Sequence, residues 1–158
     1  MYKKFITNII TALLLTGCAS TGNHSIGFAG VVKHAKPTPK TNEGNMNFLS
    51  YAKDYKHNDW NFENGIGTYK DSYHQQSFML FSNISHDKTN TRYLQPTLGL
   101  NCTYKGTSHN NDKMKVICSP PIKFRIGEHK GLFAYITPVP KIKGLTNGLI
   151  SMEVGYKF

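Results

Sequence analysis

The sequence predicts an all-β protein, an eight-stranded antiparallel up-and-down transmembrane β-barrel, and three observations lead to this fold class. Helical periodicity is almost absent after the N-terminal segment, whereas alternation of apolar and polar residues with a period of two recurs along the chain. The last strand carries this alternation to the final residue, Phe158. The only long apolar run lies at the N-terminus, which excludes a helical protein that spans a membrane several times.

The N-terminal segment predicts export. A short basic start, with Lys3 and Lys4, precedes an apolar stretch and then Leu15-Thr16-Gly17-Cys18. This tetrapeptide resembles a bacterial lipobox, which implies a lipoprotein signal peptide over residues 1–17 and a lipidated Cys18. Ala19 at the next position favours the outer membrane, by resemblance to known lipoproteins. The alternative is a conventional cleavage site beside an ordinary cysteine.

After an N-terminal tail over residues 18–25, residues 26–158 are expected to form the barrel. Turn-forming segments rich in Asn, Asp, Gly, Pro and Lys separate the candidate strands. These strands are Ile26–His34, Met46–Lys53, Trp60–Lys70, Gln76–Ser85, Arg92–Tyr104, Lys113–Ile126, Lys130–Val139 and Gly148–Phe158. An even number of strands brings both chain ends to one side, which we expect to be the periplasm.

The C-terminal strand gives the clearest pattern. One face carries Ile150, Met152, Val154, Tyr156 and Phe158, and the residues between them are polar or small. An amphipathic last strand with an aromatic C-terminal residue resembles the recognition signal of bacterial outer-membrane barrels. A soluble β-sandwich could also end in an amphipathic strand, although its apolar face seldom reaches the last residue.

The charge balance indicates the kind of partner. The 158 residues include 19 basic and 9 acidic side chains, so the formal net charge is +10. No nucleic-acid-binding motif accompanies this charge, and nucleic acid is a poor partner for an exported protein. Anionic phospholipid headgroups and the phosphates of lipopolysaccharide fit better.

Cys102 and Cys118 are placed symmetrically about the polar stretch 106–112. A hairpin that turns near residue 110 brings the two cysteines opposite each other, and the compartment is oxidising. This predicts a cross-strand disulfide. Two buried thiols are the alternative.

One constellation has the residue types for chemistry. His34 ends the first strand, and Asp71 and Ser72 follow the third, which runs in the same direction, so all three reach one rim. A histidine near a serine, with a carboxylate to orient the imidazole, can activate a hydroxyl for acyl transfer. His74 is a rival base. The alternative is that these are solvated residues at a loop boundary.

Lys70-Asp71-Ser72-Tyr73 resembles the Lys-Asp-Ser-aromatic motif of the lipid A palmitoyltransferase (PagP) family, which are eight-stranded outer-membrane barrels. Short similarities to this family also occur in His34-Ala35-Lys36, in 47–50, at the prolines and in the last strand. The resemblance implies transfer of a palmitoyl chain from phospholipid to lipid A. In this interpretation His34 is the general base, Ser72 the assisted hydroxyl and Asp71 the neighbouring carboxylate.

Prolines predict a weak seam in the wall. Pro120, Pro121 and Pro138 cannot donate to a β-ladder, so they would open the hydrogen bonding between adjacent strands. The gap would act as a lateral gate for an acyl chain. The alternative is a simple bulge or turn. The predicted lumen, with Glu153 and Lys157, is more polar on its periplasmic half than an acyl-binding interior requires.

Three interpretations therefore stay open. The first is an outer-membrane acyltransferase that acts on phospholipid and lipid A without metal or other cofactor. The second is a non-enzymatic, monomeric barrel whose charged loops bind a surface partner or alter the envelope. The third is a soluble periplasmic β-rich protein anchored only through Cys18.

Overall fold

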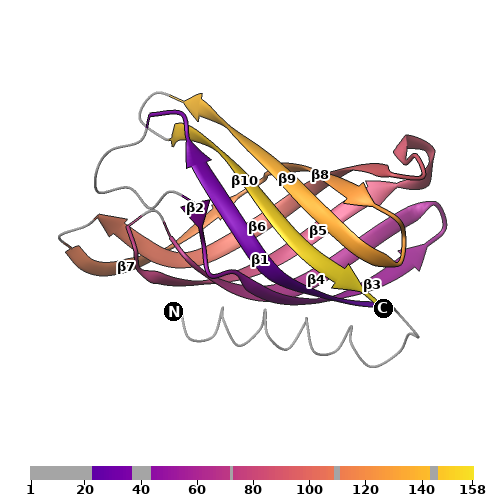
Figure 1. Cartoon of the computed structure of the whole chain (residues 1–158), viewed down its shortest axis with the longest axis horizontal. Helices are drawn as coiled ribbons and strands as arrows, with labels where there is room; N and C mark the ends of the chain where they lie inside the picture. The colour runs from indigo at the N-terminus through magenta and orange to yellow at the C-terminus, as the bar shows by residue number, and fades with distance from the viewer. Residues whose placement is uncertain (1–22, 37–43, 72, 109–110, 143–145) are drawn as a thin grey trace.

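The protein, seen in a computed structural model, is described over residues 23–36, 44–71, 73–108, 111–142 and 146–158. The expected signal peptide over 1–17, the lipidation site Cys18 and the candidate hydroxyl of Ser72 lie outside these residues. The described chain forms one antiparallel sheet that winds into a barrel (Figure 1). The first and last strands pair with each other, from Ser25 opposite Lys157 to His34 opposite Leu149, so the sheet is closed.

The wall is crossed eight times, as predicted. Two of the crossings are each made of two shorter strands, β2 with β3 and β7 with β8. The elements are β1 (His24–His34), β2 (Gly44–Asn45), β3 (Leu49–His57), β4 (Trp60–Lys70), β5 (Gln76–His86), the 3-10 helix η1 (Asp87–Thr89), β6 (Leu94–Ser108), β7 (Asn111–Ser119), β8 (Ile122–Gly127), β9 (Gly131–Ile142) and β10 (Thr146–Lys157).

The crossing of β7 and β8 was predicted as the single strand Lys113–Ile126, whereas the predicted strand Met46–Lys53 left out β2 and ended before β3 does. Both breaks have a local cause. Asn47 lies between β2 and β3 with φ of 47°, a left-handed conformation that interrupts an extended strand. Pro120 and Pro121 separate β7 from β8 because neither has a backbone N–H to donate. The Pro121 carbonyl still accepts a hydrogen bond of 2.8 Å from the Gly99 N–H.

The barrel has two distinct ends. At the terminal end, the Phe158 N–H donates to the His24 carbonyl (2.8 Å), and the connections 58–59, 87–93 and 128–130 are short. At the opposite end, which we call the far end, β1 and β4 finish at His34 and Lys70 and the long β6–β7 hairpin extends beyond the wall (Figure 1).

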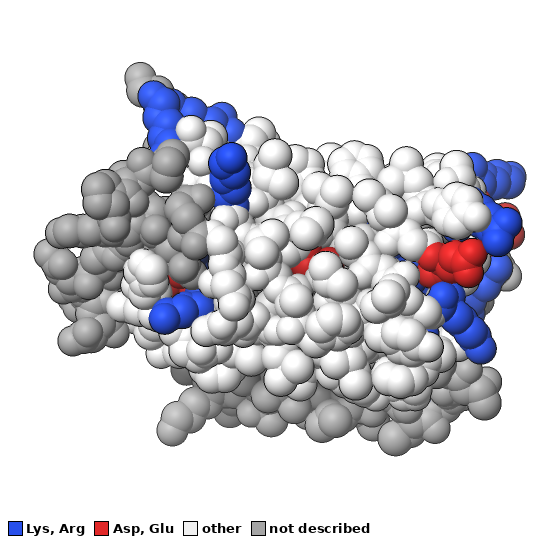
Figure 2. Space-filling model, viewed as in Figure 1, with Lys and Arg blue, Asp and Glu red and all other residues white. Residues whose placement is uncertain are grey.

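The outer surface of the barrel is apolar, whereas the lumen contains both apolar and polar side chains. Large outward side chains such as Ile66, Phe78 and Ile150 are more than half exposed. In β10 the predicted alternation is confirmed, because Ile150, Met152 and Tyr156 face out whereas Ser151 is buried. Figure 2 shows that the middle of this face of the wall carries almost no charged side chains. A closed barrel with such an apolar surface has the arrangement required in lipid, which argues against the soluble interpretation.

No helix within the described ranges is both long and apolar enough to cross a membrane.

The predicted disulfide is confirmed. Cys102 of β6 and Cys118 of β7 lie directly opposite each other in the ladder, with their Cα atoms 4.0 Å apart. Both side chains lie on the outer face, since their neighbour Thr103 is buried in the lumen. The bond therefore fastens the outer surface of the β6–β7 hairpin.

The outward face of β4 tests lipid embedding. Ile66 lies at the middle of β4, so Ile66→Arg should destabilise the barrel by about 2–4 kcal/mol in liposomes, as Arg does near a bilayer midplane. The matched control is Leu94→Arg at the terminal end of β6, where the cost should be about 0–1 kcal/mol. Urea unfolding of both variants measures the difference, and equal costs would contradict a lipid-embedded wall.

Candidate functional site

The far-end rim holds two of the three predicted site residues. His34 is the last residue of β1, and Asp71 directly follows β4. Both are buried, with 9% and 1% of their surface exposed. His34 lies two residues after Val32, and Asp71 two residues after Tyr69, so by strand alternation each points to the lumen as its neighbour does. The prediction that β1 and β4 bring these residues to one rim therefore agrees with the strand directions, whereas their chemical role stays a prediction.

The Asp71 carboxylate organises the turn between β4 and β5. Its Oδ1 accepts hydrogen bonds from the backbone N–H groups of Tyr73 (2.8 Å) and Gln75 (3.0 Å). Its Oδ2 accepts from the Ser77 hydroxyl at 3.0 Å. The Asp71 carbonyl accepts from the His74 N–H (3.0 Å), and His74 has φ of 63°. This local role explains the burial of the carboxylate without any catalytic function.

The ladder fixes how His34 and Asp71 are related. The Gly30 carbonyl accepts from the Met46 N–H, and the Met46 carbonyl accepts from the Lys70 N–H, so Gly30 and Lys70 share one row across the wall. His34 lies four residues beyond this row and Asp71 one. With the usual strand rise and spacing, their Cα atoms are roughly 14 Å apart along the wall. The two residues thus reach the rim from strands that are not neighbours.

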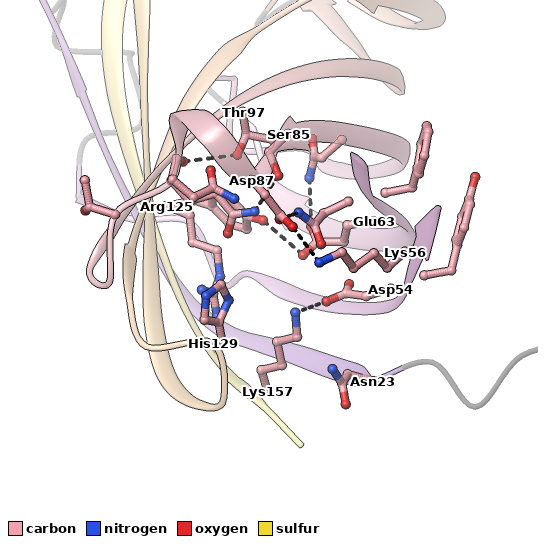
Figure 3. A pocket seen from close by; sticks show the side chains of 18 of the residues that line it. Asn23, Asp54, Lys56, Glu63, Ser85, Asp87, Thr97, Arg125, His129 and Lys157 are labelled. Atoms are coloured by element: carbon pink, nitrogen blue, oxygen red, sulfur yellow. Dashed lines mark hydrogen bonds and ion pairs between the residues drawn. The ribbon is translucent and has the colours of Figure 1, made fainter. Parts of the chain in front are cut away.

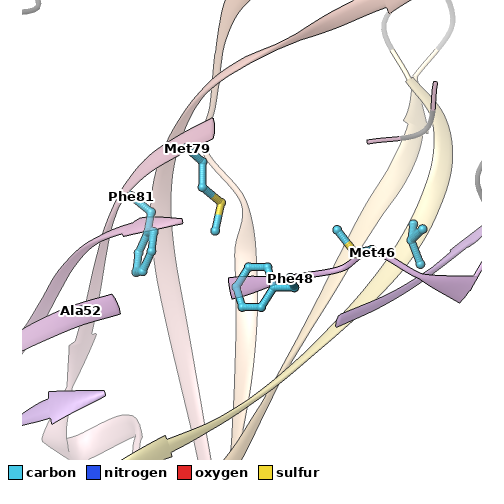
Figure 4. Packing of buried hydrophobic residues seen from close by; sticks show 6 residues of the cluster. Met46, Phe48, Ala52, Met79 and Phe81 are labelled. Carbon is cyan, nitrogen blue, oxygen red and sulfur yellow. The ribbon is translucent and has the colours of Figure 1, made fainter. Parts of the chain in front are cut away.

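The lumen below this rim is filled by apolar side chains (Figure 4). A buried cluster is formed by Val32, Met46, Phe48, Ala52, Met79 and Phe81, and Tyr69 and Leu149 pack against it. Two inward glycines make room for its rings: a Cβ on Gly27 would lie 2.5 Å from the Phe48 ring, and one on Gly65 would lie 2.3 Å from the Phe81 ring. Beneath the cluster, Phe48, Phe81, Lys123 and Tyr135 border a cavity of about 10 Å³. That space holds about one water molecule and no acyl chain.

The wall is incompletely paired where prolines were predicted to open it. The β8–β9 ladder runs only from Gly127 opposite Phe133 to Phe124 opposite Ile136. Beyond Ile136, β9 pairs with β10 and β7 pairs with β6, and among the described residues no backbone pairing joins β7 to β9. Pro120 and Pro121 flank this seam on one side and Pro138 on the other. A gating role for these prolines stays a prediction.

A polar cavity of about 630 Å³ opens at the terminal end, which the sequence analysis did not foresee (Figure 3). Lys157 is ion-paired with Asp54, and Lys56 Nζ donates to Asp87 Oδ2 at 2.5 Å. The hydrogen bond from Lys56 lowers the pKa of the Asp87 carboxyl, and a second from Asn61 adds to this effect.

Deeper in this cavity, the Glu63 carboxylate accepts from Asn83 Nδ2 (2.7 Å) and from the Tyr135 hydroxyl (3.0 Å). Glu63 and Arg125 are both buried and both line the cavity. Strand parity was the available signal, because alternation places Lys123 and Arg125 on the inward face of β8. The pairing between distant strands could not be read from the sequence.

Within the described ranges, no group of three or more His, Cys, Asp or Glu side chains is arranged to hold a metal ion.

No protein-family model matches the chain, and a search of curated proteins finds no match. Solved structures do resemble its fold. The outer membrane protein Ail of Yersinia pestis, in a phospholipid bilayer nanodisc, has a TM-score of 0.48 and 14% identity over 87% of this chain and 99% of its own. Neisserial surface protein A (NspA) has a TM-score of 0.42 and 12% identity over 87% and 96% of the two chains. Ail in complex with the heparin analogue sucrose octasulfate gives a TM-score of 0.36 and 15% identity, over 87% and 97%.

The likeness is to the barrel alone. At these identities and scores it carries no argument about the activity or partners of this chain. None of these structures is a lipid A palmitoyltransferase, so the resemblance drawn from short motifs gains no support from them.

The role assigned to the Asp71 carboxylate can be measured. Asp71→Ala leaves two backbone N–H groups and the Ser77 hydroxyl without their acceptor, so we expect a loss of about 2–3 kcal/mol in unfolding free energy. Asp71→Asn retains Oδ1 and should lose about 1 kcal/mol. The exposed Asp59→Ala is the control and should change stability by no more than about 0.5 kcal/mol. Urea unfolding in micelles gives these values, and a stable Asp71→Ala variant would contradict the structural role.

Proposed function

We propose that this chain is a non-enzymatic outer-membrane barrel whose basic far end binds the phosphate groups of lipid A and neighbouring anionic headgroups. The observation that carries the proposal is the charge of the far end. The described lysines there are Lys33, Lys36, Lys70, Lys105, Lys115 and Lys141. Among the described side chains of that end the one carboxylate is that of Asp71, which is buried in its turn. We refer to these six lysines as the lysine rim.

The orientation of the barrel supports this assignment. Bacterial outer-membrane barrels have short turns on the periplasmic side and longer connections outside. Here the terminal end has the start of β1, the end of β10 and the short connections, so the lysine rim points outward. Figure 2 shows basic side chains at the far end with only a small acidic area beside them, whereas acidic and basic side chains are mixed at the terminal end. A lipid anchor at Cys18 would add attachment on the periplasmic side and belongs to the same proposal.

The rim is positioned for headgroups rather than for a ligand in the lumen. Lys33, Lys115 and Lys141 are exposed, and Lys33 lies opposite the outward Ile150 in the ladder, at the edge of the apolar surface. A lysine near an anionic membrane surface contributes about 1 kcal/mol of attraction, and added salt screens this contribution. Several lysines at one level therefore favour multiply phosphorylated lipid over zwitterionic lipid.

Charge removal at the two ends tests the proposal. We expect the double variant Lys115→Gln with Lys141→Gln to bind lipid A roughly thirtyfold more weakly, because two contributions of about 1 kcal/mol are lost. The matched control, Lys88→Gln with Lys130→Gln, removes the same charge from exposed positions at the terminal end. Titration of lipid A into phosphatidylcholine nanodiscs that hold each protein gives the affinities. If both double variants weakened lipid A binding equally, only the net charge of the protein would matter. That result would refute the proposal that the lysine rim is the binding site.

A second candidate function is the acyl transfer that the sequence resemblance implies, and one observation favours it. The unpaired seam between β7 and β9 coincides with Pro120, Pro121 and Pro138, at the end that holds His34 and Asp71. A phospholipid acyl chain would enter there, and His34 with Asp71 and Ser72 would assist attack by a lipid A hydroxyl on the phospholipid ester. The new ester would form as the old one breaks, and the lysophospholipid would leave with the proton taken from the attacking hydroxyl. The packed lumen below the rim counts against this function, because an acyl chain would have to displace Met46, Phe48 and Met79.

Mass spectrometry of lipid A separates the two candidates. We expect lipid A to carry the same acyl chains in cells with the wild-type protein, with His34→Ala or with no protein. An additional acyl chain that depends on the wild-type protein and disappears with His34→Ala would overturn the non-enzymatic proposal. Heat-modifiable migration on gels must show that the His34→Ala barrel is folded.

A further inference from the structure

The terminal-end cavity has features of a ligand site that is independent of the lysine rim. Its volume of about 630 Å³ is typical of a site for a small molecule. It is bordered by charged and amide side chains from β3, β4, β5, β8 and β10, together with His129 (Figure 3). It opens at the end where the start of β1 lies beside Phe158, which faces the periplasm if the rim faces outward.

Arg125 is the exceptional group in this cavity. Only 3% of its surface is exposed, and its guanidinium lies 4.7 Å from the centre of the Phe133 ring. Its Nη2 is buried and has no hydrogen-bond partner among the described residues. The other cations around the cavity have carboxylate partners: Lys56 pairs with Asp87, Lys157 with Asp54 and Arg92 with Glu128. In the described part of the chain, Arg125 has no such partner.

A buried cation without a counter-charge is costly, since desolvation is not repaid by an ion pair. The planar guanidinium binds carboxylate and phosphate groups through two parallel hydrogen bonds, and arginine is the residue best suited to a partly buried anion. The aromatic ring of Phe133 holds the guanidinium in place but does not neutralise it. The missing partner of Arg125 is therefore an anionic group that comes from outside the chain.

Buried acceptors without a donor indicate what other groups the ligand carries. Asp54 Oδ1 and Asn83 Oδ1 are buried acceptors without a hydrogen-bond donor, and both residues line the cavity. Their remaining polar atoms are occupied, because the other Asp54 oxygen pairs with Lys157 and the Asn83 amide donates to Glu63. The Asn90 side chain also lines the cavity, and neither its Oδ1 nor its Nδ2 has a hydrogen-bond partner among the described residues. These residues thus present one unused cationic donor, one unused amide donor and three unused acceptors. The complementary molecule has an anionic group and several hydroxyl groups.

We propose that the terminal-end cavity binds a phosphorylated or carboxylated sugar, with its anionic group on Arg125 and its hydroxyls donating to Asp54 and Asn83. This site acts from the periplasmic side and requires neither acyl transfer nor lipid A binding at the far end. An inorganic anion would satisfy Arg125 alone, and an uncharged sugar would satisfy the acceptors alone.

Calorimetric titration of the folded barrel in a zwitterionic detergent tests the site with glucose 6-phosphate, glucuronate, inorganic phosphate and glucose. We expect glucose 6-phosphate or glucuronate to bind at least tenfold more tightly than phosphate or glucose. Arg125→Gln should weaken that binding at least tenfold, and Arg125→Lys, which keeps the charge without the planar fork, should give an intermediate loss. The control Arg92→Gln removes an exposed, paired arginine from the same cavity and should change affinity less than threefold.

Each outcome bears on the proposal. Failure of both sugar anions to bind the wild-type barrel, or equal binding by Arg125→Gln, overturns it. Phosphate that binds as tightly as glucose 6-phosphate overturns the assignment of hydroxyl recognition to Asp54 and Asn83. A folding defect can be recognised separately, because removal of a buried unpaired charge should leave the ligand-free Arg125→Gln barrel at least as resistant to urea as the wild type. A loss of lipid A binding at the far end would leave these titrations unchanged.

Discussion

The structure depends on one constraint, which is that the backbone of a wall in lipid must satisfy its own hydrogen bonds. Lipid offers no donors or acceptors, so a sheet with free edges is unstable there and closure removes the edges. The pairing of β1 with β10, from Ser25 opposite Lys157 to His34 opposite Leu149, provides this closure. The apolar outer surface follows from it, because once the backbone is paired the outward side chains decide whether the barrel enters the membrane.

Where the backbone pairing between strands stops, a disulfide and several prolines stabilise the wall. β7 has β6 as its ladder neighbour and none on the β9 side among the described residues, and the Cys102–Cys118 bond joins it covalently to β6. Pro120, Pro121 and Pro138 border the same seam, so this part of the wall has fewer N–H groups that need acceptors. The free-energy cost of leaving β7 and β9 unpaired is thus lower than the length of the seam suggests. Two strands of a barrel in lipid can remain unpaired where prolines replace residues with a backbone N–H and where a disulfide holds the strand to its other neighbour.

The parts of this protein that could be predicted are those set by local sequence. Period-two alternation located the strands to within a few residues, and symmetry about residue 110 placed Cys102 opposite Cys118. The rim residues were predicted by type, but the three hydrogen bonds of Asp71 within its own turn were not, because their geometry depends on His74 with positive φ. Arg125 was missed altogether. Its significance lies in the absence of a partner across the lumen, which is set by the register of strands that are distant in the sequence.

The lumen has two halves of opposite character, and this division limits what the barrel can do. Gly27 and Gly65 let Phe48 and Phe81 fill the far half, whereas Glu63, Asn83 and Arg125 make the other half polar. At the boundary the space is that of about one water molecule, so a solute has no open path between the ends. The described lumen therefore does not form a continuous pore, and the two proposed binding surfaces lie at opposite ends of one wall. The proposed basic rim and the proposed ligand cavity can each change in sequence without altering the other, since the packed cluster lies between them and separates their side chains.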